Sequence, residues 1–277
     1  MRIARVGLGM GAVAGLLLGG AGVAAAAAPQ VSFCDGPVWC DPIHTGMAGR
    51  AGDVETASLP SNTVPGERYI GAHRLVSVTI NSSFAVSVDA LGTPSLGRVD
   101  GKAVPLGETV GYIASTSLGA VTRSTTNGGL PHGVQIDDPA LNGRPDAVLV
   151  AGRLATAGAS ASALGVWYDG ARWWLYNEDG ASMAAAETFA YAEGSALGGH
   201  VVHTQANDFL GIGVYVDDAR VNGKSSAVVI PQHEFGQAVN ASALGVWYDA
   251  ARGQWVVYNE NGSALAAGQK IHYVAVP

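Results

Sequence analysis

Tryptophans within an internal repeat are the residues of this sequence best suited to binding a ligand. The stretch ASALGVWYD occurs at residues 161–169 and again at 241–249, and further tryptophans follow each copy. Indole rings bury large apolar areas, and an exposed indole offers a flat face on which a sugar ring can stack. We therefore predict binding of an extracellular glycan or cell-envelope polymer. The candidate ligand-binding residues are Trp167, Trp173, Trp174, Trp247, Trp255, Asp169 and Asp249.

Packing between units or sheets is the competing explanation for these tryptophans, and both explanations stay open here. A weaker third copy of the repeat has Ser87 in place of Trp167 and Pro94 in place of Trp173. Because both aromatic residues are missing together, we expect the two tryptophans of a copy to form one cluster across a hairpin. Trp174 lies on the other side of its strand from Trp173, which makes it the strongest candidate for an exposed aromatic side chain.

Other reactive residues do not indicate a catalytic site. The Gly-x-Ser-x-Gly motif of serine hydrolases is absent from the sequence. His200 and His203 form a close pair, but at that spacing on a strand they point to opposite faces. Four other histidines do not recur between the copies: His73, His132, His233 and His272. We therefore predict that the protein is not an enzyme, and a hydrolase of unrecognised type is the second alternative.

Aspartates recur at two kinds of position. Asp169 and Asp249, with Asp89 in the weak copy, stand where a strand enters a hairpin, so we expect them to cap turns through backbone amides. Two further pairs in loops offer the oxygen atoms that calcium prefers. Because their spacing matches no EF-hand or nonapeptide loop, they are weak candidates and no cofactor is predicted. These candidates are Asp137, Asp138, Asp217 and Asp218.

The repeat extends beyond the identical stretch and predicts how the chain is divided. DDPALNGRPDAVLV, from Asp137, corresponds to DDARVNGKSSAVVI, from Asp217, at the same spacing as the two copies of ASALGVWYD. A degenerate copy stands one further spacing upstream, with Phe84 in the place of Leu164. The predicted divisions are a signal peptide (1–27), an N-terminal extension (28–68), a degenerate unit (69–117) and two clear units (118–193 and 194–277).

Alternating apolar residues predict that each unit is built from short β-strands. Leu164, Val166 and Tyr168 share one face of an extended strand, and this face is apolar in all three copies, so we expect it to form the core. Residues 180–188 are expected to form a loop. The predicted fold class is all-β, with tandem small β-sandwich or barrel units of about 80 residues. In the last unit we expect strands at 201–204, 212–217, 227–231, 243–249, 255–259 and 270–276.

The N-terminal residues have the layout of a secretory signal peptide. Arg2 and Arg5 precede an uncharged run of Gly, Ala, Val and Leu that ends in alanines. Cleavage after Ala27 predicts a secreted protein without a membrane span, and an uncleaved anchor is the alternative. In an oxidising compartment Cys34 and Cys40 are expected to form a disulfide, with a redox or metal site less favoured.

The charge balance argues against nucleic acid as a partner. Lys and Arg number 15 against 22 Asp and Glu, which gives a net charge of −7. Without the two arginines of the leader, 13 basic residues face 22 acidic ones and the net charge is −9. Binding to phosphates requires a basic surface, and the sequence has no cluster of Lys or Arg.

One resemblance supports the repeat and the extracellular setting. The Gly-Val-Trp-Tyr-Asp pattern, preceded by Asp-x-x-x-x-Asn-Gly and followed by Asn-x-Asp-Gly, resembles a repeat domain of secreted bacterial proteins whose function is not established. The resemblance covers residues 119–277 well and 84–114 weakly, and it implies no catalytic residues. We therefore predict a secreted, non-catalytic β-repeat protein that binds an extracellular ligand or mediates adhesion. A structural protein of the cell surface or matrix is the alternative.

Overall fold

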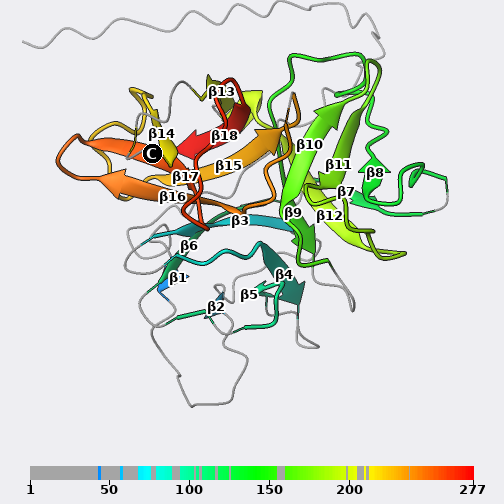
Figure 1. Cartoon of the computed structure of the whole chain (residues 1–277), viewed down its shortest axis with the longest axis horizontal. Helices are drawn as coiled ribbons and strands as arrows, with labels where there is room; N and C mark the ends of the chain where they lie inside the picture. The colour runs from blue at the N-terminus through cyan, green and yellow to red at the C-terminus, as the bar shows by residue number, and fades with distance from the viewer. Residues whose placement is uncertain are drawn as a thin grey trace, which may run out of the picture.

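The all-β prediction is confirmed by a computed structural model, in which three lobes of strands surround a common centre (Figure 1). In the described part of the chain, no helix is long and apolar enough to cross a membrane. The predicted signal peptide, Cys34, Cys40 and Asp89 lie outside the described residues. The structure describes residues 43–44, 57–58, 68–75, 79–88, 94–102, 104–105, 108–115, 118–124, 126–154, 160–197, 199–204, 209, 212–236 and 238–277.

We number the degenerate unit first and the two clear units second and third. The first unit and its extension hold β1 (Ile43–His44), β2 (Ala57–Ser58), β3 (Arg68–Arg74), β4 (Phe84–Val88), β5 (Pro94–Arg98) and β6 (Thr109–Ser115). The second unit holds β7 (Gly119–Thr122), β8 (Gly133–Gln135), β9 (Leu149–Leu154), β10 (Leu164–Tyr168), β11 (Trp173–Asn177) and β12 (Thr188–Glu193). The third unit holds the 3-10 turn η1 (Ser195–Leu197), β13 (Gly199–His203), β14 (Gly213–Val216), β15 (Val228–Glu234), β16 (Leu244–Asp249), β17 (Gln254–Asn259) and β18 (Lys270–Val276).

The strands of the third unit confirm the prediction made from the turns. All six predicted strands correspond to β13 to β18, with ends that differ by a few residues at most. Residues 180–187 contain turns and no helix, so the expected loop is also confirmed. Asn-Gly turns and alternating apolar residues were therefore sufficient signals for the local structure.

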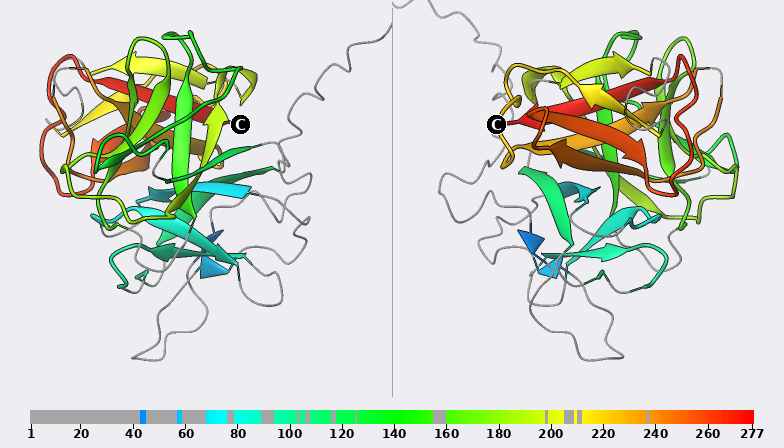
Figure 2. Two further views of the ribbon diagram at one scale, coloured as in Figure 1. Left: turned by 90° about the vertical axis from the view of Figure 1, so that its right-hand side faces the viewer. Right: turned by 60° about the vertical axis from the view of Figure 1, so that its left-hand side comes forward.

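Each six-stranded sheet combines three strands from one unit with three strands from the next. The orders are β1-β6-β3-β16-β17-β14, β13-β18-β15-β10-β11-β8 and β2-β5-β4-β9-β12-β7. Pairs inside each half are antiparallel, whereas the central pair that joins two halves is parallel: β4 with β9, β10 with β15 and β16 with β3. The first unit thus pairs with the second, the second with the third, and the third with the first. The three units form a closed ring, which Figure 2 shows from two further sides.

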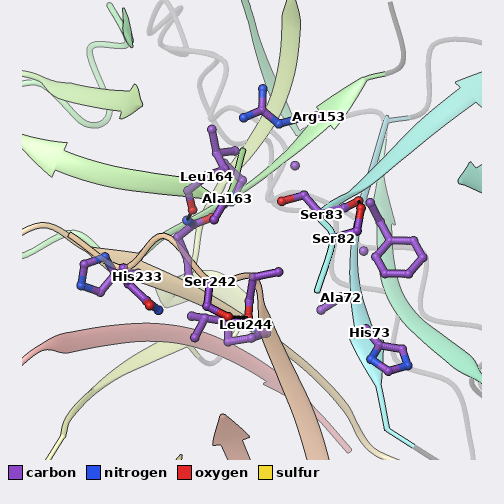
Figure 3. A pocket seen from close by; sticks show the side chains of 18 residues that line it. Ala72, His73, Ser82, Ser83, Arg153, Ala163, Leu164, His233, Ser242 and Leu244 are labelled. Atoms are coloured by element: carbon purple, nitrogen blue, oxygen red, sulfur yellow. Dashed lines mark hydrogen bonds between the residues drawn. The ribbon is translucent and has the colours of Figure 1, made fainter. Parts of the chain in front are cut away.

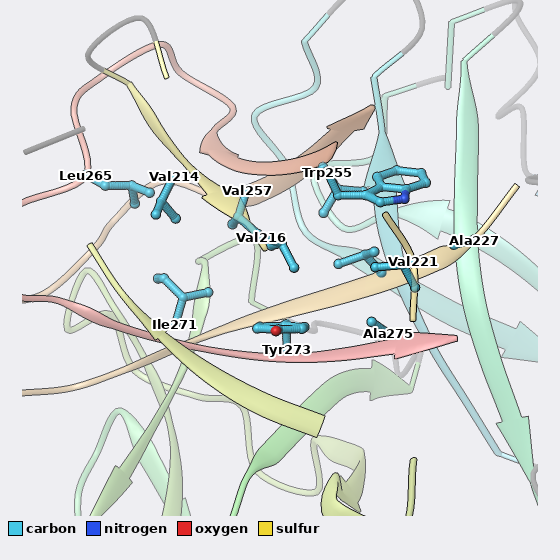
Figure 4. Close-up of a cluster of buried hydrophobic side chains, with 12 residues drawn as sticks. Val214, Val216, Val221, Ala227, Trp255, Val257, Leu265, Ile271, Tyr273 and Ala275 are labelled. Atoms are coloured by element: carbon cyan, nitrogen blue, oxygen red, sulfur yellow. The ribbon is translucent and has the colours of Figure 1, made fainter. Parts of the chain in front are cut away.

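Every unit is a small sandwich with a core of its own. Because the strands of one unit lie in two different sheets, the two half-sheets face each other and enclose apolar side chains. In the third unit this core contains Val216, Trp255 and Ile271 from three different strands (Figure 4). The second unit has an equivalent core around Val166 and Trp173. The expected core face of the repeated strand is therefore confirmed at Val166 and Val246, which are almost fully buried.

A fourth apolar cluster lies at the centre of the ring and is shared by all units. Ile70, Val150 and Ile230 stand at equivalent positions of the three units, one repeat apart, and each is at most 1% exposed. The neighbouring residues in these strands point into the cores of the individual units. Strands β3, β9 and β15 are therefore buried on both faces. The units are repeated in sequence, but each shares buried surface with the other two.

Buried ionisable side chains stand at three equivalent places where two units meet. His73, Arg153 and His233 also stand one repeat apart from each other, and each is at most 2% exposed. His73 lies between two carboxylates, with Nδ1 2.5 Å from Glu260 and Nε2 3.0 Å from Glu108. The prediction that these histidines do not recur is therefore wrong, because His73 and His233 are equivalent and Arg153 stands between them.

The carboxylate that faces each of these histidines explains the glycine of the repeated motif. Glu178 reaches from the β10–β11 hairpin to His233, with 2.5 Å between its Oε1 and the ring Nδ1. A Cβ atom at Gly165 would collide with this carboxylate, and the same holds for Gly245 and the carboxylate of Glu260. The glycine therefore leaves room for an acid that the next unit requires.

The first unit lacks this glutamate and this glycine, and a different ion pair forms where it meets the second unit. It carries Val99 where the others have glutamate, and Ala85 where they have glycine. Arg153, which faces this hairpin, pairs with Glu187 of its own unit instead. Glu187 also accepts a hydrogen bond from the Ser160 amide at 3.2 Å. The neighbouring unit's glutamate accepts the corresponding amide hydrogen at the other two joints.

Removal of one partner of the buried Arg153–Glu187 pair should destabilise the ring. We expect Arg153→Met to lower the free energy of unfolding by about 3–5 kcal/mol, because Glu187 is left as an unpaired buried charge. Adding Glu187→Gln should recover part of that loss, since the third unit uses Gln269 at the same place. Arg172→Met is the control at the exposed ion pair with Asp137, and it should cost at most about 1 kcal/mol. Denaturant titration of all four proteins tests this, and equal losses for both single variants would contradict it.

The stability should also depend on pH through Glu234. Burial opposes ionisation of this side chain, but hydrogen bonds from His272 and Lys270 hold the pKa of Glu234 below its ordinary 4.5. Such a group stabilises the fold above the unfolded pKa and loses this effect as pH falls through the folded pKa. We expect Glu234→Gln to flatten the fall in unfolding free energy below about pH 5. Titrations from neutral to acidic pH, with Glu193→Gln as surface control, measure this slope, and an unchanged slope would refute the assignment.

Candidate ligand-binding site

The register of the β10–β11 hairpin separates its tryptophans onto two faces. Tyr168 pairs with Trp173 across the hairpin, with ring centroids 5.4 Å apart, and this pair faces the core. Trp167 pairs with Trp174 at 6.1 Å on the outer face. Trp173 is fully buried, and its Nε1 donates to the Arg144 carbonyl at 2.9 Å.

Two of the candidate tryptophans are therefore unavailable to a ligand. Residues directly opposite each other across a hairpin share a face, so Trp173 belongs with Tyr168 and not with Trp167. Trp255 of the third unit is equally buried and donates to the Lys224 carbonyl at 3.1 Å. The prediction that the two tryptophans of a copy form one cluster is therefore wrong. The alternative prediction, that the tryptophans pack inside the protein, holds for Trp173 and Trp255.

Trp174 is also less exposed than predicted. Its side chain faces outward, as predicted, but it is only 9% exposed, with the Trp167 ring tilted beside it and Gly129 and Gly133 close to its ring. Its Nε1 donates to Asp169 Oδ2 at 2.7 Å. Trp174 therefore supports Trp167 and does not itself provide an exposed face. Trp167 remains half-buried, with part of its surface open.

Asp169 caps the hairpin turn, as predicted. Its Oδ1 accepts hydrogen bonds from the amides of Ala171 and Arg172, both at 2.8 Å. Partial desolvation raises the pKa of this carboxyl, but the bonds from Trp174 and these amides outweigh it and lower the pKa. The charged carboxylate thus positions both the turn and the indole.

The third unit carries a related but separate aromatic surface. The Phe209 ring lies tilted against Trp247, with centroids 5.1 Å apart, and it meets the Tyr215 ring edge-on at 5.8 Å. The Tyr215 hydroxyl donates to Asp249 at 2.8 Å and lowers the pKa of that carboxyl. Arg252 lies over the Tyr215 ring at 3.9 Å. Asp249 caps its turn through the amides two and three residues further on, so the two hairpin aspartates have the same role.

The weak calcium candidates are engaged by groups of the protein. Asn142 donates to Asp137 at 2.9 Å, and Asn222 makes the equivalent bond to Asp217 at 2.8 Å. The second aspartate of each pair accepts the amide two residues further on. Among the described residues, no group of three His, Cys, Asp or Glu side chains is placed to hold a metal ion. These residues thus order the loops that carry them: Asp137, Asp138, Asp217 and Asp218.

A pocket of about 270 Å³ lies where the second unit's hairpin meets the loop that follows β15 of the third unit. We call it the inter-unit pocket. Cavities of roughly 150 Å³ can already hold a benzene ring, so this volume admits a ring-sized group. The pocket is lined by Leu130, His132, Trp167, Tyr176, Asn177, Glu178, Gly180, Phe235 and Val239.

Aromatic side chains from both units form the walls of the inter-unit pocket. Trp167 and Tyr176 come from β10 and β11, and Phe235 follows β15. The rings of Tyr176 and Phe235 stand almost at right angles, at 85°, with centroids 6.0 Å apart. Phe235 is 37% exposed and Val239 is 54% exposed, which is high for large apolar side chains.

A buried Glu178–His233 contact holds the floor of the pocket. Glu178, which lines it, is bound to His233 at 2.5 Å and accepts the Asn240 amide at 2.8 Å. Burial first, and then the charges of Glu178 and Glu234, raise the pKa of Tyr176 far above its ordinary value. The walls are therefore held by the same group that joins the two units.

The corresponding surface of the first unit is different. Ser87 and Ser95 replace the outward tryptophans of the hairpin, and their hydroxyls are 2.8 Å apart. Where the third unit joins the first, Leu75 stands at the position of Phe235. The framework is thus repeated, while the aromatic walls of the inter-unit pocket are particular to one joint.

A smaller cavity of about 70 Å³ lies at the centre of the ring, between β3, β9 and β15 (Figure 3). Ser83, Ser242 and Leu244 are among the residues drawn around it. Gln232 crosses between the units here, where it accepts the Ala151 amide at 3.2 Å and donates to the Leu164 carbonyl. The volume suits a few water molecules, since each needs about 10–15 Å³.

Of the nine residues that line the inter-unit pocket, sequence reasoning selected only Trp167. Tyr176 and Glu178 recur as Tyr258 and Glu260, so their repetition was visible, but the partner of each glutamate lies in the next unit. Phe235 and Val239 have no repeated pattern that would select them. The equal spacing of His73, Arg153 and His233 was the available signal for the joints.

Comparison with known proteins places the repeat in a family. A family described as a domain of unknown function, DUF7452, matches residues 110–192 and again residues 190–275. No curated protein and no solved structure matches the chain. Each matched segment begins in the last strand of the preceding unit, β6 or β12, and runs through the second or third unit. The chain therefore belongs to the DUF7452 family, with two tandem copies of this domain of unknown function.

Proposed function

We propose that the protein is a secreted, non-catalytic module that binds an extracellular ligand, a glycan or a cell-envelope polymer, in the inter-unit pocket. The observation that carries this proposal is the exposed apolar pair Phe235 and Val239 beside the half-buried Trp167. Large exposed apolar side chains around a concave surface are typical of binding sites. The proposed secretion rests on the layout of the leader sequence.

The chemistry of the pocket favours stacking over polar recognition. Trp167, Tyr176 and Phe235 supply aromatic surface, while the side chains of Asn177 and Glu178 already bind groups of the protein. A sugar ring has one face rich in C–H groups, which can pack against an indole while its hydroxyls remain in water. A polymer with repeated rings would gain from contacts at more than one place.

The walls of the pocket are tied together by contacts between the two units. Its walls come from two units, and both units are held by the parallel pairing of β10 with β15 and by the Glu178–His233 pair. Groups that are ordered before binding lose little conformational entropy when the ligand arrives. We infer that these contacts reduce the entropy lost when a ligand binds.

A structural role at the cell surface or in a matrix is the second candidate. It is favoured by the closed ring of units and by Trp173 and Trp255, which serve the cores and not a surface. In this case the inter-unit pocket would have no ligand of its own. Binding measurements therefore separate the two candidates.

Removal of the Trp167 indole should weaken ligand binding. We expect Trp167→Ala to lower affinity for a bound polysaccharide or envelope polymer by roughly tenfold or more, the equivalent of about 1.4 kcal/mol of stacking. Trp247→Ala, at the equivalent position outside the pocket, is the matched control and should keep most of the affinity. Isothermal titration calorimetry with a panel of polymers measures the affinities of the signal-free protein and of both variants. Each titration is done with and without calcium. Failure of the unaltered protein to bind any polymer would leave the structural candidate.

A further inference from the structure

The inter-unit pocket has a more specific chemistry than a general apolar cleft. Three different aromatic side chains, Trp167, Tyr176 and Phe235, line a single cavity. Two of them are nearly perpendicular, so they form a corner and not a flat platform. A flat platform suits an extended ring, whereas a corner of aromatic rings surrounds a compact group from several sides.

Aromatic corners attract cations because each ring carries negative charge on its face. A methylated ammonium group is the cation that fits an apolar cavity best, since its methyl groups need no hydrogen-bond acceptors and its charge is spread over them. An unmethylated ammonium is strongly hydrated and would lose its water on entry. The walls therefore distinguish between these two kinds of cation.

The charge around the pocket agrees with a cationic ligand. Among the described residues, no Lys or Arg lines it, and Glu178 contributes a carboxylate. Glu234, which lies next to Phe235 in the chain, is already paired with Lys270 and His272, so Glu178 is the carboxylate that acts on the pocket. His233 contacts Glu178, and His132 is also among the lining residues. The whole chain carries a net charge of −7, which attracts cations to its surface.

We propose that the inter-unit pocket binds a methylated ammonium group, with Trp167, Tyr176 and Phe235 as aromatic walls and Glu178 as counter-charge. This inference rests on the proposed function, because it names the group by which a ligand is held in the same site. The shared chemistry is a trimethylammonium head, carried by a small molecule, a polymer substituent or a lipid headgroup.

Titration of the full chain with choline tests the proposal directly. The comparison ligand is 3,3-dimethylbutan-1-ol, which has the same shape but no charge. We expect choline to bind at least roughly threefold more tightly than the neutral alcohol, since only the cation gains from the ring faces and the carboxylate. Equal or tighter binding of the alcohol would show a purely apolar pocket and overturn the proposal.

Substitution of one wall separates ring electrostatics from apolar burial. Phe235→Leu keeps an apolar side chain but removes the ring, and Phe235 is exposed enough for the fold to tolerate the change. We expect this variant to lose choline affinity by roughly threefold or more while it retains affinity for the neutral alcohol. The control is Val201→Ala, which should change neither affinity. Val201 is an exposed apolar residue on β13, at the edge of the sheet that also contains β10 and β11. Equal losses for both ligands in Phe235→Leu would refute the cation assignment.

The source of the group and the proposed function are tested by separate measurements. Sedimentation with phosphatidylcholine vesicles, competed by free choline, would assign a lipid headgroup, whereas choline binding without vesicle binding would assign a soluble or polymer-borne group. A protein that binds a polysaccharide through Trp167 but ignores choline would overturn this inference and leave the proposed function intact. A protein that binds neither would overturn both.

Discussion

The pairing of one unit's hairpin with the next unit's strand is the constraint on which the rest of the structure depends. A unit of about 80 residues forms a sandwich, but each half-sheet ends in a strand with unpaired backbone groups. Joining β4 to β9, β10 to β15 and β16 to β3 satisfies those groups and closes the ring. Burial of Ile70, Val150 and Ile230 at the centre follows from that closure, because no single unit could cover them.

Closure also determines where charges are buried. The parallel pairing of β10 with β15 brings the hairpin of one unit beside a strand of the next. Glu178 can then reach His233 only because Gly165 has no side chain in the way. A buried charge without a partner would be costly, which explains why the first unit changed at several positions together. Val99 and Ala85 remove the acid and the gap, and Arg153 pairs within its own unit instead.

Local structure was therefore far more predictable than assembly. Asn-Gly turns and the alternation of Leu164, Val166 and Tyr168 are short-range signals, and they gave the strands and the core face correctly. The exchange of half-sheets between units involves partners such as Gly165 and His233, which are far apart in the sequence, and a single sequence offers only equal spacing as a hint of such pairs. The face of Trp173 was misjudged for a related reason, because it depends on hairpin register and not on composition.

The difference between framework and surface explains why the candidate site occurs at one joint. Positions that hold the ring together vary only with compensation, as the buried partners of His73 and Arg153 show. Among the described residues, no hydrogen bond or ion pair joins the outward side chains of Ser87, Trp167 and Trp247 to the next unit, so these positions could diverge without loss of the fold. A binding surface arises where divergence on two units coincides, as it does for Trp167 and Phe235. The repeated framework thus positions the walls of the pocket, and the differences between units provide its aromatic side chains.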